Sequence, residues 1–214
     1  MNLTLTNPAA EDYAASFSSA EDELLKEVAD FTRKTHPKSH MLSGPVQGQL
    51  LTMLSKIIRP SRILEIGTFT GYSALCLAEG LTEDGLLYTI ELREEDGAKA
   101  QSFFNKSKVK DLINLHIGNA LEIIPALDER WDIVFLDADK VNYIRYYEMV
   151  MAQLRTGGII IADNVLFHGR VLEDPVTNKN AMAIQAFNEH IKQDSRVDQV
   201  LLTVRDGLML IMKK

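Results

Sequence analysis

Short apolar runs recur along the chain from residue 62 onward, and segments of helical composition separate them. A run of this kind is typical of a strand that is buried on both faces of a parallel sheet. The alternation of such strands with helices is typical of a doubly wound α/β fold. The five predicted strands are RILEIG, LLYTIE, INLHIG, WDIVFLD and GGIIIADN.

Two helical patterns precede these runs. The first is amphipathic, begins near Ser19 as the expected N-cap and ends at Pro37. The second extends from Pro45, a residue favoured in the first turn of a helix, to Arg59, and the proline that follows ends it. We therefore expect helices to lead into the sheet.

The last part of the chain has a different pattern. VDQVLLTV and LMLIMKK are joined by the turn sequence RDG (205–207), which predicts an antiparallel hairpin at the edge of the sheet. We predict a single α/β domain over 1–214, Rossmann-like and mostly parallel. It would comprise an N-terminal arm (1–18), a helical lead-in (19–60) and the sheet core (61–214).

Composition narrows the possible partners. A chain of 214 residues with 46% hydrophobic residues suits one well-buried domain, and its net charge of −7 argues against nucleic acid as a partner. Cys76 is the only cysteine, so no internal disulfide can form, and we expect it in the core. No run approaches the ~18 apolar residues of a membrane span, and the start lacks the pattern of a signal peptide. We expect a soluble, cytoplasmic protein without a membrane partner.

The first predicted strand leads into a glycine-containing loop, LEIGTFTGYSA. Gly67 and Gly71 form a G-x-x-x-G spacing, whereas a dinucleotide site ordinarily has G-x-G-x-x-G. Glu91 ends the second strand, where an acid suits hydrogen bonding to the two hydroxyls of a ribose. A small-residue turn that ends at Ala120 follows the third strand and would let an adenine ring lie against the backbone. These features predict a nucleoside site without fixing which nucleoside.

Charged residues follow the fourth and fifth strands directly. Asp137, Asp139 and Lys140 lie in FLDADK, and Asp163 with Asn164 ends GGIIIADN. Because neighbouring parallel strands end side by side, we expect the two strand-end aspartates to face each other. Two carboxylates and an amide oxygen suit Mg²⁺, Mn²⁺ or Ca²⁺. The alternative is that FLDADK simply begins a loop and helix, where aspartates cap and lysines are solvated.

Taken together, five segments resemble the cation-dependent class I O-methyltransferases, the group that includes caffeoyl-CoA O-methyltransferase and catechol O-methyltransferase. They are LEIGTFTGYSA, the acid that ends the next strand, FLDADKVNY, GGIIIADNVLFHGRV and RDGLMLIMKK. The resemblance extends from about Ser19 to the last residue. It implies S-adenosylmethionine as methyl donor, a divalent cation that is usually Mg²⁺, a small aromatic diol as acceptor, and a homodimer.

The resemblance also implies roles for individual residues. Those that match the donor site are Glu65, Gly67, Tyr72, Ser73, Glu91, Ala120 and Asp137. Those that match the metal ligands are Asp137, Asp163 and Asn164. Lys140 matches the lysine that takes the hydroxyl proton, although it is equally able to steer the phenolate by its charge. The plant enzymes have an acidic pair where this chain has Val46-Gln47, so we assign no substrate role there.

Several other residues keep two interpretations. Met41 either covers the donor or packs in the core, and Asp139 either binds a ligand or caps the following helix. His168 is expected in a pocket wall or at the surface. Tyr13 and Phe17, in the N-terminal arm, are expected to contact a partner subunit.

The combined prediction is an enzyme. It transfers a methyl group from S-adenosylmethionine to a hydroxyl of a catechol-type or hydroxycinnamoyl molecule with the help of a divalent cation. One alternative is an NAD(P)-dependent oxidoreductase, which explains the glycine loop and Glu91 but not the aspartates. The other is a nucleoside-binding protein without catalysis, since a fold alone does not guarantee activity.

Overall fold

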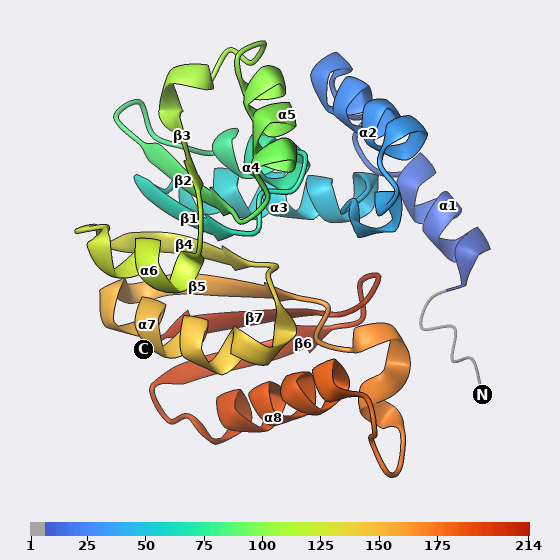
Figure 1. Cartoon of the computed structure of the whole chain (residues 1–214), viewed down its shortest axis with the longest axis vertical. Coiled ribbons are helices and arrows are strands. Elements are labelled where there is room, and N and C mark those ends of the chain that lie inside the picture. Colours follow the sequence, from blue (N-terminus) through green and yellow to red (C-terminus); the bar gives the residue numbers. More distant parts are fainter. Residues whose placement is uncertain (1–6) are drawn as a thin grey trace.

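A computed structural model describes residues 7–214, which form a seven-stranded sheet of order β3-β2-β1-β4-β5-β7-β6 (Figure 1). The strands are β1 (Arg62–Ile66), β2 (Leu86–Glu91), β3 (Ile113–Ile117), β4 (Trp131–Leu136), β5 (Leu154–Asp163), β6 (Val197–Leu202) and β7 (Leu208–Lys213). Strands β1 to β5 are parallel to one another, whereas β7 is antiparallel to both β5 and β6. The predicted Rossmann-like sheet with a C-terminal antiparallel hairpin is therefore confirmed.

Helices cover both faces of this sheet. Their bounds are α1 (Pro8–Ser16), α2 (Glu23–Thr35), α3 (Pro45–Ile58), α4 (Tyr72–Ala78), α5 (Glu94–Phe104), α6 (Ala120–Ile123), α7 (Tyr143–Gln153) and α8 (Lys179–Gln193). Residues of α2 to α5 share one hydrophobic cluster with the sheet, and residues of α6 to α8 share the other. None of these helices is long and apolar enough to cross a membrane.

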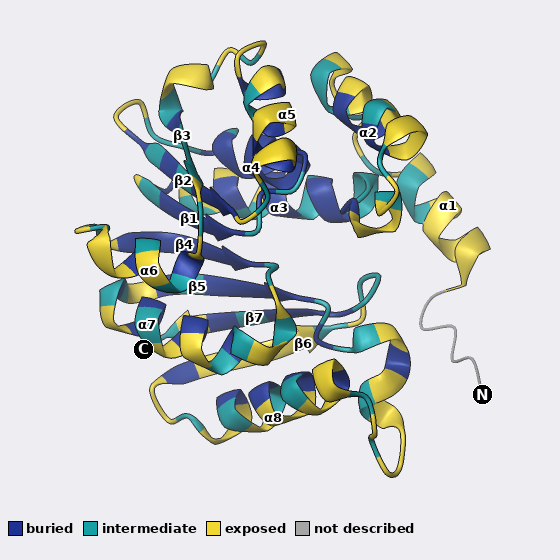
Figure 2. Ribbon diagram, viewed as in Figure 1, coloured by how far each residue is buried: buried dark blue, intermediate teal, exposed yellow. Residues whose placement is uncertain are grey.

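The strands divide their side chains between these two clusters because successive residues of a strand point to opposite faces. Ile63 of β1 packs on the side of α2 to α5, and its neighbour Leu64 packs on the side of α6 to α8. Every residue of the central strand β4 is buried, as its apolar sequence predicts (Figure 2). The core thus lies on both sides of the strands that lead into the predicted site.

The N-terminal part differs from expectation in one detail. Helix α2 begins at Glu23, and its N-cap is Asp22, whose carboxylate accepts a hydrogen bond from the Leu25 amide (2.7 Å). The expected cap, Ser19, lies three residues too early, because the apolar repeat that packs on the sheet starts only at Leu24. The second helix begins at Pro45, as predicted.

Tyr13 and Phe17, at the exposed end of α1, stack on each other with ring centroids 4.5 Å apart. They are 65% and 76% exposed. The homodimer to which we assigned them stays a prediction.

The order of the strands reverses between β1 and β4. From β1 the chain continues outward to β2 and β3, and from β4 it continues outward in the opposite direction to β5. Ligands of doubly wound sheets bind in the crevice that forms beyond the carboxyl ends of the strands at such a point. The glycine loop after β1 and FLDADK after β4 both lie there.

Candidate active site

A cavity of about 1120 Å³ opens at the carboxyl ends of the parallel strands. Each of β1 to β5 contributes a residue at or just after its end: Gly67, Glu91, Gly118, Asp137 and Asp163. Residues of segment 38–47, of the loop after β5 and of the β6–β7 turn form further walls. The sheet therefore brings together most of the segments that the sequence marks as functional.

The glycine loop lies against the end of β4. The Asp137 amide donates to the Ile66 carbonyl (2.9 Å), and a Cβ atom at Gly67 would lie 2.0 Å from the Asp137 carbonyl oxygen. Gly67 also has a φ of +106°, which disfavours any residue with a side chain. The donor loop and the first aspartate consequently form one continuous wall.

Glu91 holds this loop from the side of β2. One of its carboxylate oxygens accepts a hydrogen bond from the Phe69 amide (2.7 Å), and the other accepts one from the Arg93 amide (2.9 Å). A carboxylate oxygen can accept more than one hydrogen bond, so both retain capacity for a ligand hydroxyl. Glu91 lines the cavity and is only 5% exposed. Its position suits the ribose role.

Three predicted donor residues do not line the cavity. The Tyr72 hydroxyl donates to Glu21 (2.5 Å), and its ring lies so close to Gly48 that a Cβ atom there would be 2.7 Å away. Ser73 follows in the same first turn of α4 and is buried. Because α4 packs on α3, the Tyr72 ring faces the helical layer, whereas the Ser73 hydroxyl lies close enough to the Glu65 carboxyl of β1 to lower its pKa. A direct contact of Tyr72 with the donor does not fit this placement.

Glu65, the third, is fully buried within β1. The Thr89 hydroxyl donates to its Oε2 (2.5 Å), whereas Oε1 has no hydrogen-bond partner among residues 7–214. Burial raises the pKa of Glu65 to about 8, and the charges of Asp137 and Glu91 act in the same direction. An unpaired buried carboxylate oxygen beneath the loop fits a polar or cationic ligand group, as the amino group of a methionine-type donor would be.

The two strand-end aspartates lie side by side, because Leu136 and Ala162, which precede them, are paired in the sheet. Asp163 is 3% exposed, and its Oδ1 accepts a hydrogen bond from the Asn164 amide (2.6 Å). Burial, followed by the charge of Asp137, raises the pKa of Asp163 to about 7. A pair of close carboxylates, one of them buried, is stabilised by a cation between them, so these residues fit a divalent metal ion.

The Lys140 side chain is hydrogen-bonded within this site. Its Nζ donates to Asp137 Oδ1 (2.9 Å) and to the Tyr143 hydroxyl (2.5 Å), and its side chain is 11% exposed. The Tyr143 hydroxyl in turn donates to the Asp163 carbonyl (2.9 Å). The alternative of a solvated lysine is therefore wrong, because Lys140 and the two aspartates share one hydrogen-bonded group.

Asp139 is exposed, and its side chain does not cap a helix. Its carboxylate accepts hydrogen bonds from the Tyr146 hydroxyl (2.7 Å) and from Asn142 Nδ2 (2.6 Å). All three residues line the cavity. Asp139 thus belongs to a polar wall that a ligand can contact.

The remaining predicted residues also reach the cavity. Met41, Ala120, Asn164 and His168 line it. Their roles in binding stay predictions.

Sequence reasoning missed several residues of this wall. Gln47, Phe69, Tyr146 and Arg205 line the cavity although no role was assigned to them. Gln47 comes from α3, more than a hundred residues before the aspartate that it contacts. The only signal at this position was its departure from the acidic pair of the plant enzymes.

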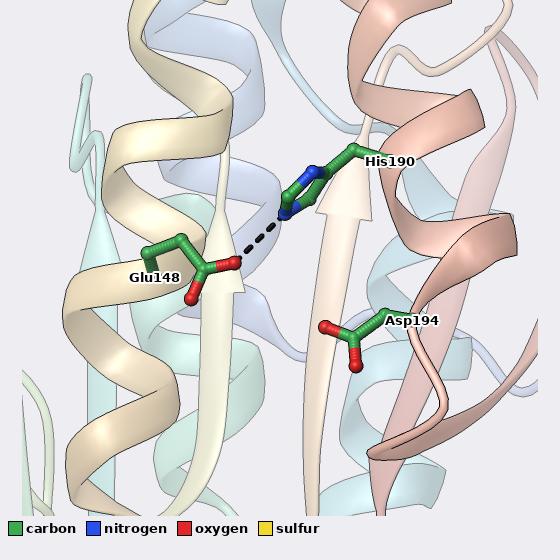
Figure 3. A group of neighbouring side chains, drawn as sticks. All are labelled: Glu148, His190 and Asp194. Carbon is green, nitrogen blue, oxygen red and sulfur yellow. Dashed lines mark hydrogen bonds and ion pairs between the residues drawn. The ribbon is translucent and has the colours of Figure 1, made fainter.

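A second group of acidic and histidine side chains lies outside the cavity: Glu148, His190 and Asp194 (Figure 3). It joins α7 to the end of α8. Arg196 donates to both carboxylates, with Nη2 at 2.8 Å from Glu148 and 2.5 Å from Asp194. The guanidinium occupies the position of a cation, so this group is an ion-pair network that holds two helices together.

Comparison with known proteins identifies the family to which the chain belongs. The sequence model of the O-methyltransferase family matches residues 15–214. A probable caffeoyl-CoA O-methyltransferase of Dictyostelium discoideum is 35% identical over 209 residues, covering 94% of this chain and 90% of the relative. A catechol O-methyltransferase of Niastella koreensis is 31% identical over 180 residues, covering 80% and 81%. The crystal structure of an O-methyltransferase from Bacillus cereus in complex with SAH is 31% identical, with a TM-score of 0.88 and coverage of 96% and 97%.

The fold, with its cavity at the switch point of the sheet, and these relatives therefore define the class of protein as an α/β methyltransferase. The chain belongs to the O-methyltransferase family and is an S-adenosylmethionine-dependent O-methyltransferase. The oxidoreductase and non-catalytic alternatives are set aside.

Glu65 gives a testable dependence of stability on pH. Its pKa is about 8 in the folded chain and near the ordinary 4.5 when unfolded. Between these values the folded chain holds a proton that the unfolded chain releases, so the free energy of unfolding falls as pH rises. We expect Glu65→Gln to remove this contribution, whose limiting slope is about 1.4 kcal/mol per pH unit.

The measurement is urea unfolding of both proteins from pH 5 to 8. Glu83→Gln, which changes an exposed carboxylate, is the matched control and should follow the wild type. Parallel curves for wild type and Glu65→Gln would contradict the prediction.

Proposed function

We propose that this chain transfers a methyl group from S-adenosylmethionine to a hydroxyl of a catechol-type or hydroxycinnamoyl small molecule, assisted by a divalent cation, preferentially Mg²⁺. The observation that carries the proposal is the juxtaposition of Asp137 and Asp163 at neighbouring strand ends, with Lys140 hydrogen-bonded to the first. All three line the cavity that also contains Glu91. Donor site and acceptor site would then share one wall.

At the end of the cavity that would hold the methyl donor, the chain supplies a carboxylate and a stretch of backbone that a ligand can approach closely. Glu91 would accept hydrogen bonds from the ribose hydroxyls, and each such bond to a charged group contributes about 1.5 to 3 kcal/mol. Gly67 lets the backbone approach the donor, and the turn at Ala120 offers small residues to the adenine. Met41 would cover the donor, since it lines the same cavity.

At the acceptor end, the chain supplies oxygen ligands. The carboxylates of Asp137 and Asp163 balance the charge of a divalent cation, and the Asn164 side chain adds an amide oxygen. When bound, such a cation would coordinate the two oxygens of a vicinal diol and lower the pKa of the hydroxyl. The two neighbouring hydroxyls of a catechol or of a caffeoyl group have this arrangement.

Lys140 would receive the proton that the acceptor hydroxyl loses. Its Nζ lies within hydrogen-bond distance of Asp137, so an acceptor held at that carboxylate is within its reach. Transfer of a methyl group from a sulfonium to a phenolate cancels opposite charges, so positioning supplies most of the catalysis. No covalent enzyme intermediate is required.

The requirement for a metal ion is tested by removing it. We expect protein treated with EDTA to lose turnover of a catechol acceptor, and Mg²⁺ or Mn²⁺ to restore it. Asp163→Ala should lower turnover at limiting Mg²⁺ by at least about tenfold, since it removes a ligand. Asp128→Ala, which removes an exposed carboxylate outside the cavity, is the control. Full turnover by metal-free protein would refute the proposal.

The role of Lys140 is tested with two acceptors, a catechol and a nitrocatechol whose hydroxyl is already ionised. If Lys140 takes the proton, Lys140→Ala should lower kcat with catechol by about 10²–10⁴-fold and with nitrocatechol by much less. The readout is the ratio of the two losses. Equal losses would assign to Lys140 an electrostatic role instead, and no loss with either acceptor would exclude it from the reaction.

A further inference from the structure

We propose that Gln47 is a positioning residue for the divalent cation: it fixes the orientation of the Asp163 carboxylate, and the β6–β7 turn fixes Gln47. This inference rests on the proposed use of a divalent cation at Asp137, Asp163 and Asn164. It goes beyond that proposal because it assigns a function to a residue of α3 that lies outside the set of ligands.

The central contact is a short hydrogen bond. Gln47 Nε2 donates to Asp163 Oδ2 at 2.6 Å, and the two residues are 116 positions apart in the chain. Gln47 is 1% exposed and lines the cavity. With Asn164 N on Oδ1, both oxygens of Asp163 are held by donors, so the carboxylate cannot rotate without losing a hydrogen bond in a buried place.

The neighbours of Gln47 determine which way its amide points. Arg205 Nη1 lies 3.4 Å from Gln47 Oε1, and a guanidinium only donates hydrogen bonds. The Asp163 carboxylate, when ionised, only accepts them. The amide therefore presents its oxygen to Arg205 and its nitrogen to Asp163. In the reverse orientation two donors would face each other at Arg205 and two acceptors would face each other at Asp163.

The β6–β7 turn holds the segments on both sides of this contact. Arg205 Nη1 donates to the carbonyl of Leu42 (2.7 Å) and to that of Ser43, just before α3 begins. Asp206 accepts from the His168 amide (2.5 Å) through its carboxylate and from the Leu166 amide (2.9 Å) through its carbonyl. One turn thereby ties the start of α3 to the loop that follows Asp163.

The absence of a charge on Gln47 also affects the Asp163 carboxylate. An ionised acid at this position would place a third carboxylate within hydrogen-bond distance of Asp163, which already lies beside Asp137 at the neighbouring strand end. An amide instead stabilises the ionised carboxylate through its N–H group, as partners of metal ligands do. Two carboxylates then remain to balance the two charges of the cation.

The experiment measures the Kd of Mg²⁺ by titration calorimetry on the full chain, without a methyl acceptor. We expect Gln47→Leu, which keeps the volume of the side chain and removes the donor, to weaken Mg²⁺ binding by about 10–100-fold. Gln47→Asn, which keeps an amide but is one methylene too short, should weaken it similarly and serves if the leucine variant does not fold. Gln49→Leu, a change of the same kind on the same helix outside the cavity, should bind Mg²⁺ like the wild type.

A second measurement separates positioning from general damage. The Kd of S-adenosylmethionine in metal-free protein should be unchanged in Gln47→Leu, because the donor end of the cavity does not depend on this contact. Parallel losses of both affinities would overturn the inference. So would normal Mg²⁺ binding by Gln47→Leu when Asp163→Ala has lost it. A wild-type chain that binds no Mg²⁺ would overturn both this inference and the proposed metal dependence.

Discussion

The closeness of two carboxylates at neighbouring strand ends, those of Asp137 and Asp163, is the constraint on which the rest of the site depends. The pairing of Leu136 with Ala162 brings them together, and the burial of Asp163 weakens the screening of their repulsion by water. The surrounding groups compensate for this repulsion. Lys140 donates to Asp137, and Gln47 donates to Asp163. The proposed cation site would make use of an arrangement whose repulsion otherwise acts against folding.

The same strand ends connect the proposed cation site to the proposed donor site. The Asp137 amide donates to the Ile66 carbonyl of β1, and the Asp137 carbonyl oxygen occupies the space that a side chain at position 67 would need. The next loop residues are held by Glu91 through the Phe69 amide. A shift of the glycine loop would therefore move Asp137, so one backbone contact couples the proposed donor site to the proposed acceptor site.

Parts of the chain outside the parallel sheet complete the site. Helix α3 contributes Gln47, and the antiparallel hairpin contributes Arg205, which holds the segment before that helix. Gln47 and Arg205 both line the cavity. The helical lead-in and the hairpin, which flank the parallel strands in sequence, consequently supply walls of the cavity in addition to those from the strand ends.

The sequence by itself determined the order of strands and helices, the glycine loop and the acids at the strand ends, because each depends on local periodicity or on the position of a residue relative to its own strand. Tertiary packing decided the rest. Tyr72 matched the donor motif, but the contact between α4 and α3 turns it toward Glu21. Gln47 carried no local signal, since its partner lies 116 residues away. A hydrogen bond between distant segments forms only when the helix layer, the sheet and the hairpin have packed against one another. No pattern within a single segment predicts that two such side chains will lie within hydrogen-bond distance.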